Sequence, residues 1–290
     1  MLSISYCMNN ILSVMTLEKR PIGVFDSGYG GLTILDELIK LMPEYDFIYL
    51  GDNARAPYGT RSFDVIYQYT LQAVEQLFSM GCQLVILACN TASAKALRTI
   101  QQKDLPLIAP DRRVLGVIRP SVEELGLLSQ TEHVGILGTL GTVRSESYLM
   151  EIAKLYPSFI VSQESCPTWV PLVENREYDN DGGRYFIKKH IDSLLSKDED
   201  IDSIILACTH YPILREEIES ILPDHIRLIS QGEIVARSLK NYLERHPEMD
   251  QVCSKTGEIK FYTTEYISDF EEKAGIFLKR NLKAQHITLQ

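Results

Sequence analysis

Short apolar segments and amphipathic segments alternate along the first part of the chain. The apolar runs cover Ile22 to Phe25, Phe47 to Leu50 and Leu84 to Ala88. Between them, apolar side chains recur at helical spacing from Leu32 to Met42 and again over residues 65–77. This alternation of strands and helices predicts an α/β fold with a parallel sheet.

The second part of the chain repeats the scheme. The segment VGILGT at 134–139 resembles IGVFDS at 22–27, and IILACTH at 204–210 resembles VILACNT at 85–91. The two pairs have similar separations along the chain, and the second pair ends twice in Ala-Cys. An internal repeat of this kind predicts two related α/β halves.

Turn residues suggest where the chain passes between the halves. Gly116 and Pro120 interrupt the pattern after the first half, and a return is expected near 228–232. The apolar run IKFYTT, which begins at Ile259, would then rejoin the first sheet. The sequence predicts two pseudo-symmetric parallel-sheet α/β domains with the active site at their interface. The predicted parts are an N-terminal tail, a first domain and a second domain, at 1–20, 21–116 with 229–290, and 117–228.

Composition narrows the class of protein. The 290 residues are 45% hydrophobic and 23% charged, which is typical of a globular protein. Lys and Arg number 29 against 39 Asp and Glu, so the net charge is −10. This acidity, without a dense basic cluster, argues against nucleic acid as a partner. No apolar run approaches the roughly 18 residues expected of a membrane span, so no membrane association is predicted.

Six widely spaced cysteines, without a CxxC pair, are too few for a disulfide scaffold. The N-terminal segment has no basic stretch before its apolar residues, and Asn9 and Asn10 interrupt it. It therefore resembles a short tail more than a signal peptide. These features predict a cytoplasmic protein, in which thiols stay reduced and can do chemistry.

Two of the cysteines, Cys89 and Cys208, follow corresponding apolar strands. A single buried cysteine most often acts as a small hydrophobic side chain, but the paired occurrence favours a chemical role. If the halves face each other, the two thiols would flank one ligand. Two acid/base groups on opposite faces of a carbon are what a racemase needs, because one removes a proton and the other delivers one.

Eight segments, in order, carry a resemblance over about residues 22–277. They are IGVFDSGYGGL, GDNARAPYG, ACNTASA, GVIRP, GTLGTVRS, CPTWVPLVE, LACTHYPIL and FYTTE. With them the sequence resembles the glutamate racemases of the cofactor-independent aspartate/glutamate racemase superfamily. Thr209-His210 favours glutamate over aspartate, since aspartate racemases of this superfamily typically carry Thr-Glu there.

The resemblance implies the following expectations. Cys208 would take the proton from L-glutamate and Cys89 from D-glutamate, with no cofactor and no metal, to supply D-glutamate for peptidoglycan. It also implies a homodimer, whose arrangement the sequence leaves open. Glu174 matches a family carboxylate near the second cysteine. The positions that match substrate-binding residues of the family are Asp26, Ser27, Tyr58, Gly59, Asn90, Thr91, Thr209 and His210.

Several of these residues also have ordinary structural explanations. Asp26 would suit the N-cap of the following helix, and Gly59 a plain turn. Glu174 would equally suit an exposed surface position. The chain also departs from the family where an acidic motif is usual, because residues 230–233 are Ser-Gln-Gly-Glu.

Three other classes of protein compete with a racemase. A zinc enzyme would use Cys89, Cys208 and His210 as ligands, but only one closely spaced pair exists. A cysteine hydrolase would leave the second Ala-Cys-Thr unexplained. A two-lobed amino-acid-binding protein would explain the repeat but not the two thiols.

Overall fold

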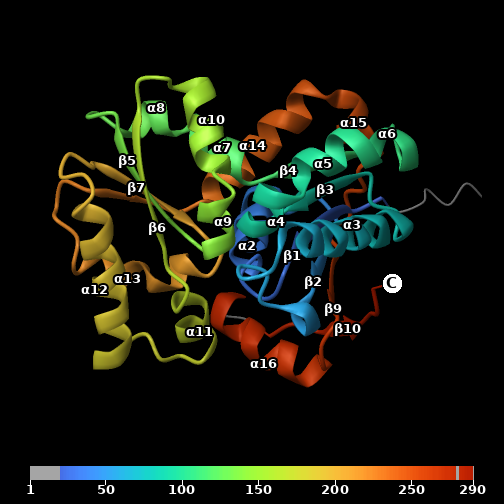
Figure 1. The fold of residues 1–290 in the computed structure, drawn as a ribbon. Helices are drawn as coiled ribbons and strands as arrows, with labels where there is room; N and C mark the ends of the chain where they lie inside the picture. Colours follow the sequence, from blue (N-terminus) through green and yellow to red (C-terminus); the bar gives the residue numbers. More distant parts are fainter. Residues whose placement is uncertain (1–19, 279–280, 290) are drawn as a thin grey trace, which may run out of the picture.

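A computed structural model describes residues 20–278 and 281–289 (Figure 1). Residues 1–19 of the predicted tail, including Cys7, lie outside the described residues. Among the helices that are described, none has the length and apolar character needed to cross a membrane.

The first sheet has six strands, all parallel, in the order β10-β9-β2-β1-β3-β4. The predicted return of the IKFYTT segment is confirmed, because β9 pairs with β2 along its whole length. The strands are β1 Ile22–Asp26, β2 Phe47–Gly51, β3 Leu84–Leu87, β4 Arg113–Gly116, β9 Ile259–Thr263 and β10 Ala284–His286.

The second sheet has four parallel strands in the order β6-β5-β7-β8, the same arrangement as β2-β1-β3-β4. Register agrees as well as order. Gly23 lies opposite Val85 in the first sheet, and Gly135 lies opposite Ile204 in the second. The repeat seen in the sequence is therefore a repeat of structure, and the predicted fold class is confirmed. These strands are β5 His133–Gly138, β6 Ile160–Ser165, β7 Ser203–Ala207 and β8 Arg227–Ile229.

Helices cover both sheets. The helices and turns beside the first sheet are α2 Leu32–Leu41, η1 Asn53–Arg55, α3 Phe63–Ser79, α4 Asn90–Lys95, α5 Leu97–Thr99, η2 Ile100–Asp104, α6 Leu105–Ile108, α14 Gly232–Arg245, α15 Pro247–Val252 and α16 Ile267–Leu278. Those nearer the second sheet are α7 Ile118–Glu123, α8 Leu125–Leu128, α9 Leu140–Arg144, α10 Ser147–Leu155, α11 Trp169–Glu174, α12 Asp181–Leu195, η3 Tyr211–Leu214 and α13 Arg215–Glu219.

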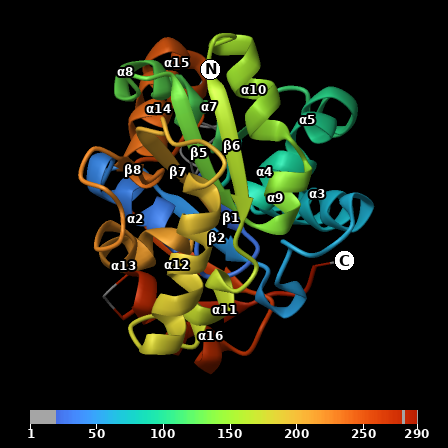
Figure 2. The same cartoon turned by 60° about the vertical axis from the view of Figure 1, so that its left-hand side comes forward.

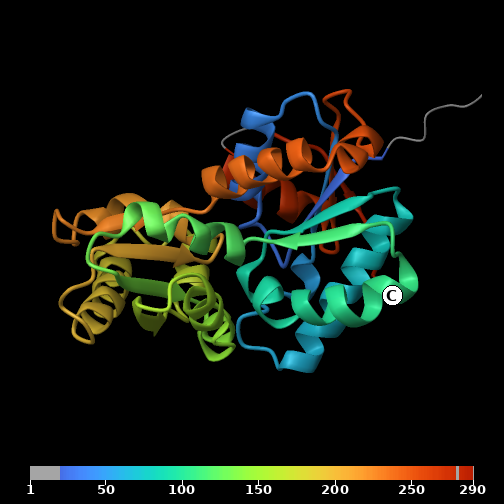
Figure 3. The same ribbon diagram turned by 90° about the horizontal axis from the view of Figure 1, so that it is seen from above.

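The two sheets form two lobes that lie side by side (Figure 3). The chain enters the second lobe after β4 and returns after β8, and α14 then packs against α2 of the first lobe. This path supports the proposed division into a first domain of 21–116 with 229–290 and a second domain of 117–228.

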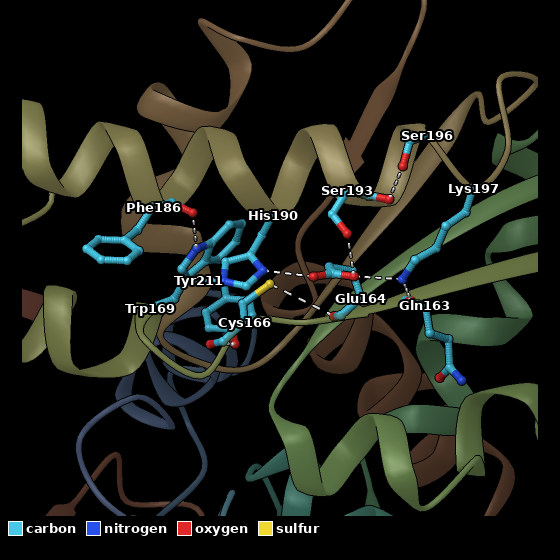
Figure 4. A network of polar contacts seen from close by, with 10 residues as sticks. All are labelled: Gln163, Glu164, Cys166, Trp169, Phe186, His190, Ser193, Ser196, Lys197 and Tyr211. Carbon is cyan, nitrogen blue, oxygen red and sulfur yellow. Dashed lines mark hydrogen bonds and ion pairs between the residues drawn. The ribbon is translucent and has the colours of Figure 1, made fainter.

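A partly buried carboxylate joins the edge of the second sheet to the helix that covers it (Figure 4). Glu164, on the edge strand β6, accepts hydrogen bonds from His190 Nδ1 at 2.8 Å, Ser193 Oγ at 3.0 Å and Lys197 Nζ at 2.6 Å. The Trp169 ring meets His190 edge-on, with the ring centroids 6.2 Å apart. The network thus fixes α12 and the start of α11, into which the chain runs from β6 (Figure 2).

Replacing Glu164 tests this anchor. Burial alone would raise the pKa of Glu164, but its hydrogen bonds to Lys197, His190 and Ser193 bring that pKa below its usual range. The carboxylate therefore stabilises the fold above the pKa of an unfolded glutamate, and this contribution is lost as the pH falls through the lowered value. We expect Glu164→Gln to lower the free energy of unfolding by about 1–3 kcal/mol at pH 7.

Urea denaturation between pH 7 and pH 4 measures this difference. The gap between wild type and E164Q should narrow as the pH falls below about 4.3. Glu123→Gln is the control, because Glu123 pairs with Arg119 on the surface and should cost less than about 0.5 kcal/mol. A gap for E164Q that does not change with pH would contradict the charged anchor.

Candidate active site

The two repeated cysteines occupy equivalent places in the two sheets. Cys89 lies just beyond the carboxyl end of β3 and is the N-cap residue of α4, and Cys208 directly follows β7. Each residue is only 6% exposed. The two thiols interact electrostatically with each other, and both interact with Asp26. The structure therefore brings both cysteines to one site between the sheets.

Asp26 links the two halves of this site. It ends β1 and is fully buried. One carboxylate oxygen accepts a hydrogen bond from the backbone N–H of Gly28 at 2.9 Å, and the other accepts one from the hydroxyl of Thr209 at 3.3 Å. The N-cap position of α2 belongs to Gly31, so Asp26 is not the N-cap residue, although its carboxylate also interacts with the backbone N–H of Gly31.

The glycine-rich turn after Asp26 packs closely against Thr209 and His210 of the second half. A Cβ atom on Gly30 would overlap with Thr209 Oγ1 and His210 Nδ1. Thr33 Oγ1 donates to the backbone carbonyls of Gly30 and Thr209, at 2.8 and 3.1 Å. Only glycine permits this close approach, which brings Thr209 and His210 against the first sheet.

Burial holds both thiols in their neutral form. Burial, together with the neighbouring Asp26 carboxylate, raises the pKa of Cys89 to about 11. A hydrogen bond between Cys89 Sγ and Ser27 Oγ, at 3.4 Å, and backbone N–H groups oppose this shift. The pKa of Cys208 is also raised by burial, and the backbone N–H of His210 opposes that shift.

His210 is paired with the predicted carboxylate. His210 Nε2 lies 2.9 Å from Glu174 Oε1, and its ring meets Phe277 edge-on with the centroids 5.2 Å apart. The side chain of Glu174 is 25% exposed, so it is not the freely solvated surface residue of the alternative explanation. Glu174 thus orients the imidazole that follows Cys208.

Threonine hydroxyls from both halves meet beside Cys89. Thr91 Oγ1 lies 2.9 Å from Thr139 Oγ1 and 3.4 Å from Thr142 Oγ1. Thr139 also caps α9, where it accepts from the backbone N–H of Thr142 at 3.2 Å. The sequence analysis did not identify Thr139 or Thr142 as site residues. The signal was present, because Thr139 follows β5 as Ser27 follows β1.

Asn90 is held by a second pair of residues that the sequence analysis did not place in the site. Its Oδ1 accepts from the hydroxyl of Tyr148 at 2.7 Å, and its Nδ2 donates to Gln231 Oε1 at 2.6 Å. Gln231 stands in the segment where the family usually has an acidic motif. Its contacts with Asn90 are revealed only by the fold.

The loop that carries Tyr58 and Gly59 meets the second half through its backbone. The carbonyl of Gly59 accepts from the backbone N–H of Gly141 at 2.7 Å. A Cβ atom on Gly59 would lie 2.9 Å from the Cβ of Thr139. The side chain of Tyr58 is buried, and its hydroxyl donates to Asp52. The Tyr58 side chain therefore supports the loop, and a substrate contact through the backbone stays a prediction.

The zinc alternative lacks a ligand cluster. Within residues 20–278 and 281–289, the one place where three potential metal-ligand atoms of His, Cys, Asp or Glu come together is at His133, Asp198 and Asp200, beside β5. Cys89, Cys208 and His210 do not form such a group. His133 Nδ1 there pairs with Asp198 at 2.8 Å. Exposed acidic groups are common without a metal, so this cluster does not indicate a metal centre either.

Comparison with known proteins identifies the family of this chain. A family model described as Asp/Glu/Hydantoin racemase matches residues 32–239. The chain belongs to this racemase family. It is 38% identical to a glutamate racemase of Roseobacter denitrificans over 276 residues, which cover 90% of this chain and 98% of the relative. It is 37% identical to a glutamate racemase of Bacillus cereus, with 94% and 98% covered.

Solved structures of family members share the fold of this racemase. A glutamate racemase of Bacillus anthracis superimposes with a TM-score of 0.85 at 32% identity, covering 94% of this chain and 98% of that one. A glutamate racemase of Francisella tularensis, solved in complex with D-glutamate, superimposes with a TM-score of 0.83 at 32% identity and the same coverage. The two-sheet arrangement is therefore that of the family.

Replacing Asp26 tests the electrostatics of the thiols. Since the carboxylate raises the pKa of Cys89, Asp26→Asn should lower it and increase the thiolate fraction at a given pH. We expect Cys89 in D26N to react with iodoacetamide several times faster than in wild type between pH 7.5 and 9. Peptide mass spectrometry measures the rate at each cysteine.

Cys82 is the internal control for this experiment. It is fully buried, and Asp26 is not among the groups that shift its pKa, so its rate should be unchanged. Slower alkylation of Cys89 in D26N would show that the carboxylate does not disfavour the thiolate.

Proposed function

We propose that this enzyme interconverts L-glutamate and D-glutamate by proton transfer at Cα between Cys89 and Cys208. The observation that carries the proposal is the equivalent placement of the two thiols, one at the end of each repeated strand, with both coupled to Asp26. A racemase needs two acid/base groups at one carbon, and the repeat supplies them from two sides.

The reaction is balanced by one thiol and one thiolate. The thiolate takes the Cα proton, and the opposite thiol gives its proton to the other face of the planar carbanion. The enzyme is left with the charges exchanged, ready for the reverse direction. Cys208 acts on L-glutamate and Cys89 on D-glutamate.

The buried site makes ionisation of the first thiol the difficult step. A pKa of about 11 leaves roughly one Cys89 thiol in a thousand ionised at pH 8, which corresponds to about 4 kcal/mol. Asp26, whose own pKa is raised by burial, is suited to accept the proton of Cys89. His210, held by Glu174, is suited to the same task for Cys208. Binding of the substrate ammonium group would further favour a thiolate.

Polar groups around the thiols suit an amino acid. The hydroxyls and amide of Ser27, Asn90, Thr91 and Thr209 would bind the α-carboxylate and ammonium, together with the backbone at Tyr58 and Gly59. Glutamate is proposed as the substrate because the similar proteins are named glutamate racemases, and one of them was solved with D-glutamate. The D-glutamate formed would serve peptidoglycan synthesis.

We also propose a cytoplasmic homodimer that needs no cofactor. Catalysis by two thiols requires that both stay reduced, as they do in that compartment. Sedimentation equilibrium would give the mass in solution, and a monomer at catalytic concentrations would refute the dimer.

The decisive experiment follows the circular dichroism of L-glutamate and of D-glutamate with purified enzyme and no added cofactor. Both should converge on the racemic signal. Dependence on pyridoxal phosphate, or loss of activity with a metal chelator, would refute the two-thiol mechanism. Equal or faster turnover of aspartate would refute the substrate assignment.

Single cysteine variants test the two roles separately. Cys89→Ser and Cys208→Ser should each lower racemisation by at least about 10³-fold, because a proton must reach the opposite face. With a glutamate analogue that carries a β-leaving group, C89S should eliminate mainly from the L-isomer through Cys208. C208S should eliminate mainly from the D-isomer through Cys89.

Cys82→Ser is the matched control for these variants. Cys82 is buried against β1 near Gly23, outside the site, and its replacement should leave racemisation within about twofold of wild type. The same enantiomer preference in C89S and C208S would show that the thiols do not act on opposite faces.

A further inference from the structure

A closed ring of hydrogen bonds includes Asn90, the residue that follows Cys89. Asn90 Nδ2 donates to Gln231 Oε1 at 2.6 Å, Gln231 Nε2 donates to the hydroxyl of Tyr148 at 2.9 Å, and that hydroxyl donates to Asn90 Oδ1 at 2.7 Å. All three side chains are at most 2% exposed. Asn90 begins α4, Tyr148 lies on α10 and Gln231 precedes α14, so the ring joins elements of both lobes.

The direction of the ring is set by a backbone carbonyl. The carbonyl of Val117 can only accept, and it accepts from Ser121 Oγ at 2.7 Å. Ser121 has then used its hydrogen, so its oxygen must accept from Gln231 Nε2 at 2.7 Å. Gln231 Nε2 also lies 3.4 Å from the Val117 carbonyl. The NH₂ end of Gln231 is therefore fixed toward α7, and its oxygen must face Asn90.

This order fixes the side-chain amide of Asn90 in turn. Because Gln231 presents an oxygen, Asn90 must present its NH₂ group there and its oxygen to Tyr148. An NH₂ group has two hydrogens, and Gln231 takes one of them. Among the described residues, Gln231 is the one acceptor for this NH₂ group, and Asn90 directly follows Cys89, so the second hydrogen can serve an acceptor such as a carboxylate oxygen of a ligand.

We infer that Gln231 is a positioning residue, which sets the direction of the Asn90 amide so that its second N–H faces the substrate carboxylate. This inference rests on the proposed function for the identity of the substrate. It also explains why a neutral amide suits this position. A glutamate here could accept from Asn90, but it offers no N–H for Tyr148 and Ser121, and it would add a negative charge near Cys89.

Gln231→Met tests the inference, since methionine has similar length but makes no hydrogen bonds of this kind. We expect KM for both glutamate isomers to rise about tenfold or more, while kcat changes less than about threefold, because substrate binding is what the amide direction controls. Gln101→Met is the matched control. Gln101 is an exposed residue that donates one partly buried hydrogen bond to the Val114 carbonyl, at 2.8 Å, so its replacement removes a single glutamine hydrogen bond elsewhere.

A second variant adds a readout that a merely structural role would not move. In Gln231→Glu the new charge should disfavour a thiolate at Cys89, so the acidic limb of kcat/KM against pH should shift to higher pH for D-glutamate. Tyr148→Phe, which breaks the ring at another member, should raise KM in the same way. In the double variant Y148F/Q231M, the fold-increase in KM should be smaller than the product of the increases in the two single variants.

The results of these experiments distinguish a failure of the positioning role of Gln231 from a failure of the proposed racemase function. A KM for Q231M within twofold of wild type, or equal to that of Q101M, overturns the positioning role. If Q231M does not fold, Y148F decides by the same KM limits, and Q231E decides by the shift of the acidic limb. If wild type does not racemise glutamate, the proposed function fails, and the ring is tested by NMR of the Asn90 side-chain amide. One of its hydrogens should be protected from exchange in wild type and in Q101M, but not in Q231M, whose side chain offers no acceptor to the Asn90 NH₂ group.

Discussion

Burial of two thiols at one site is the constraint on which the rest of the structure depends. In the proposed mechanism a thiolate removes the Cα proton, but burial at the ends of the apolar strands favours the neutral thiols of Cys89 and Cys208. Polar groups surround both thiols, and some favour the thiolate while Asp26 opposes it. Asp26 lies near both thiols, the Ser27 hydroxyl contacts Cys89, and the backbone N–H of His210 faces Cys208. The same burial excludes water, which would otherwise protonate a carbanion without regard to face.

Polar contacts cross the junction between the two lobes at the site. Thr209 of the second lobe bonds to Asp26 of the first, and Gly141 bonds to the carbonyl of Gly59. The hydroxyls of Thr91 and Thr139 meet at 2.9 Å. These contacts come from the ends of strands in both sheets, where parallel strands leave backbone groups and loop side chains free for a ligand. The scaffold and the site therefore share the same residues.

The structural repeat places a cysteine at an equivalent point of each sheet, but the residues around the two cysteines differ. The equivalent strands β3 and β7 end alike in Ala-Cys, but different residues follow. Asn90 enters a neutral ring with Tyr148 and Gln231, whereas His210 pairs with the carboxylate of Glu174. Each cysteine thus has its own environment, which suits the proposed division of roles between the two glutamate isomers.

The sequence by itself determined the α/β class, the repeat and the two cysteines, because strand periodicity and Ala-Cys at a strand end are local features. The sequence motifs shared with the racemase family added six predicted substrate-binding residues: Asp26, Ser27, Asn90, Thr91, Thr209 and His210. Only the tertiary structure decided which residues complete the site. Gln231 is 141 residues from Asn90, and Thr139 is 48 residues from Thr91. No local pattern encodes such a contact, since it depends on how two separately folded sheets meet and on which buried polar groups must then find partners.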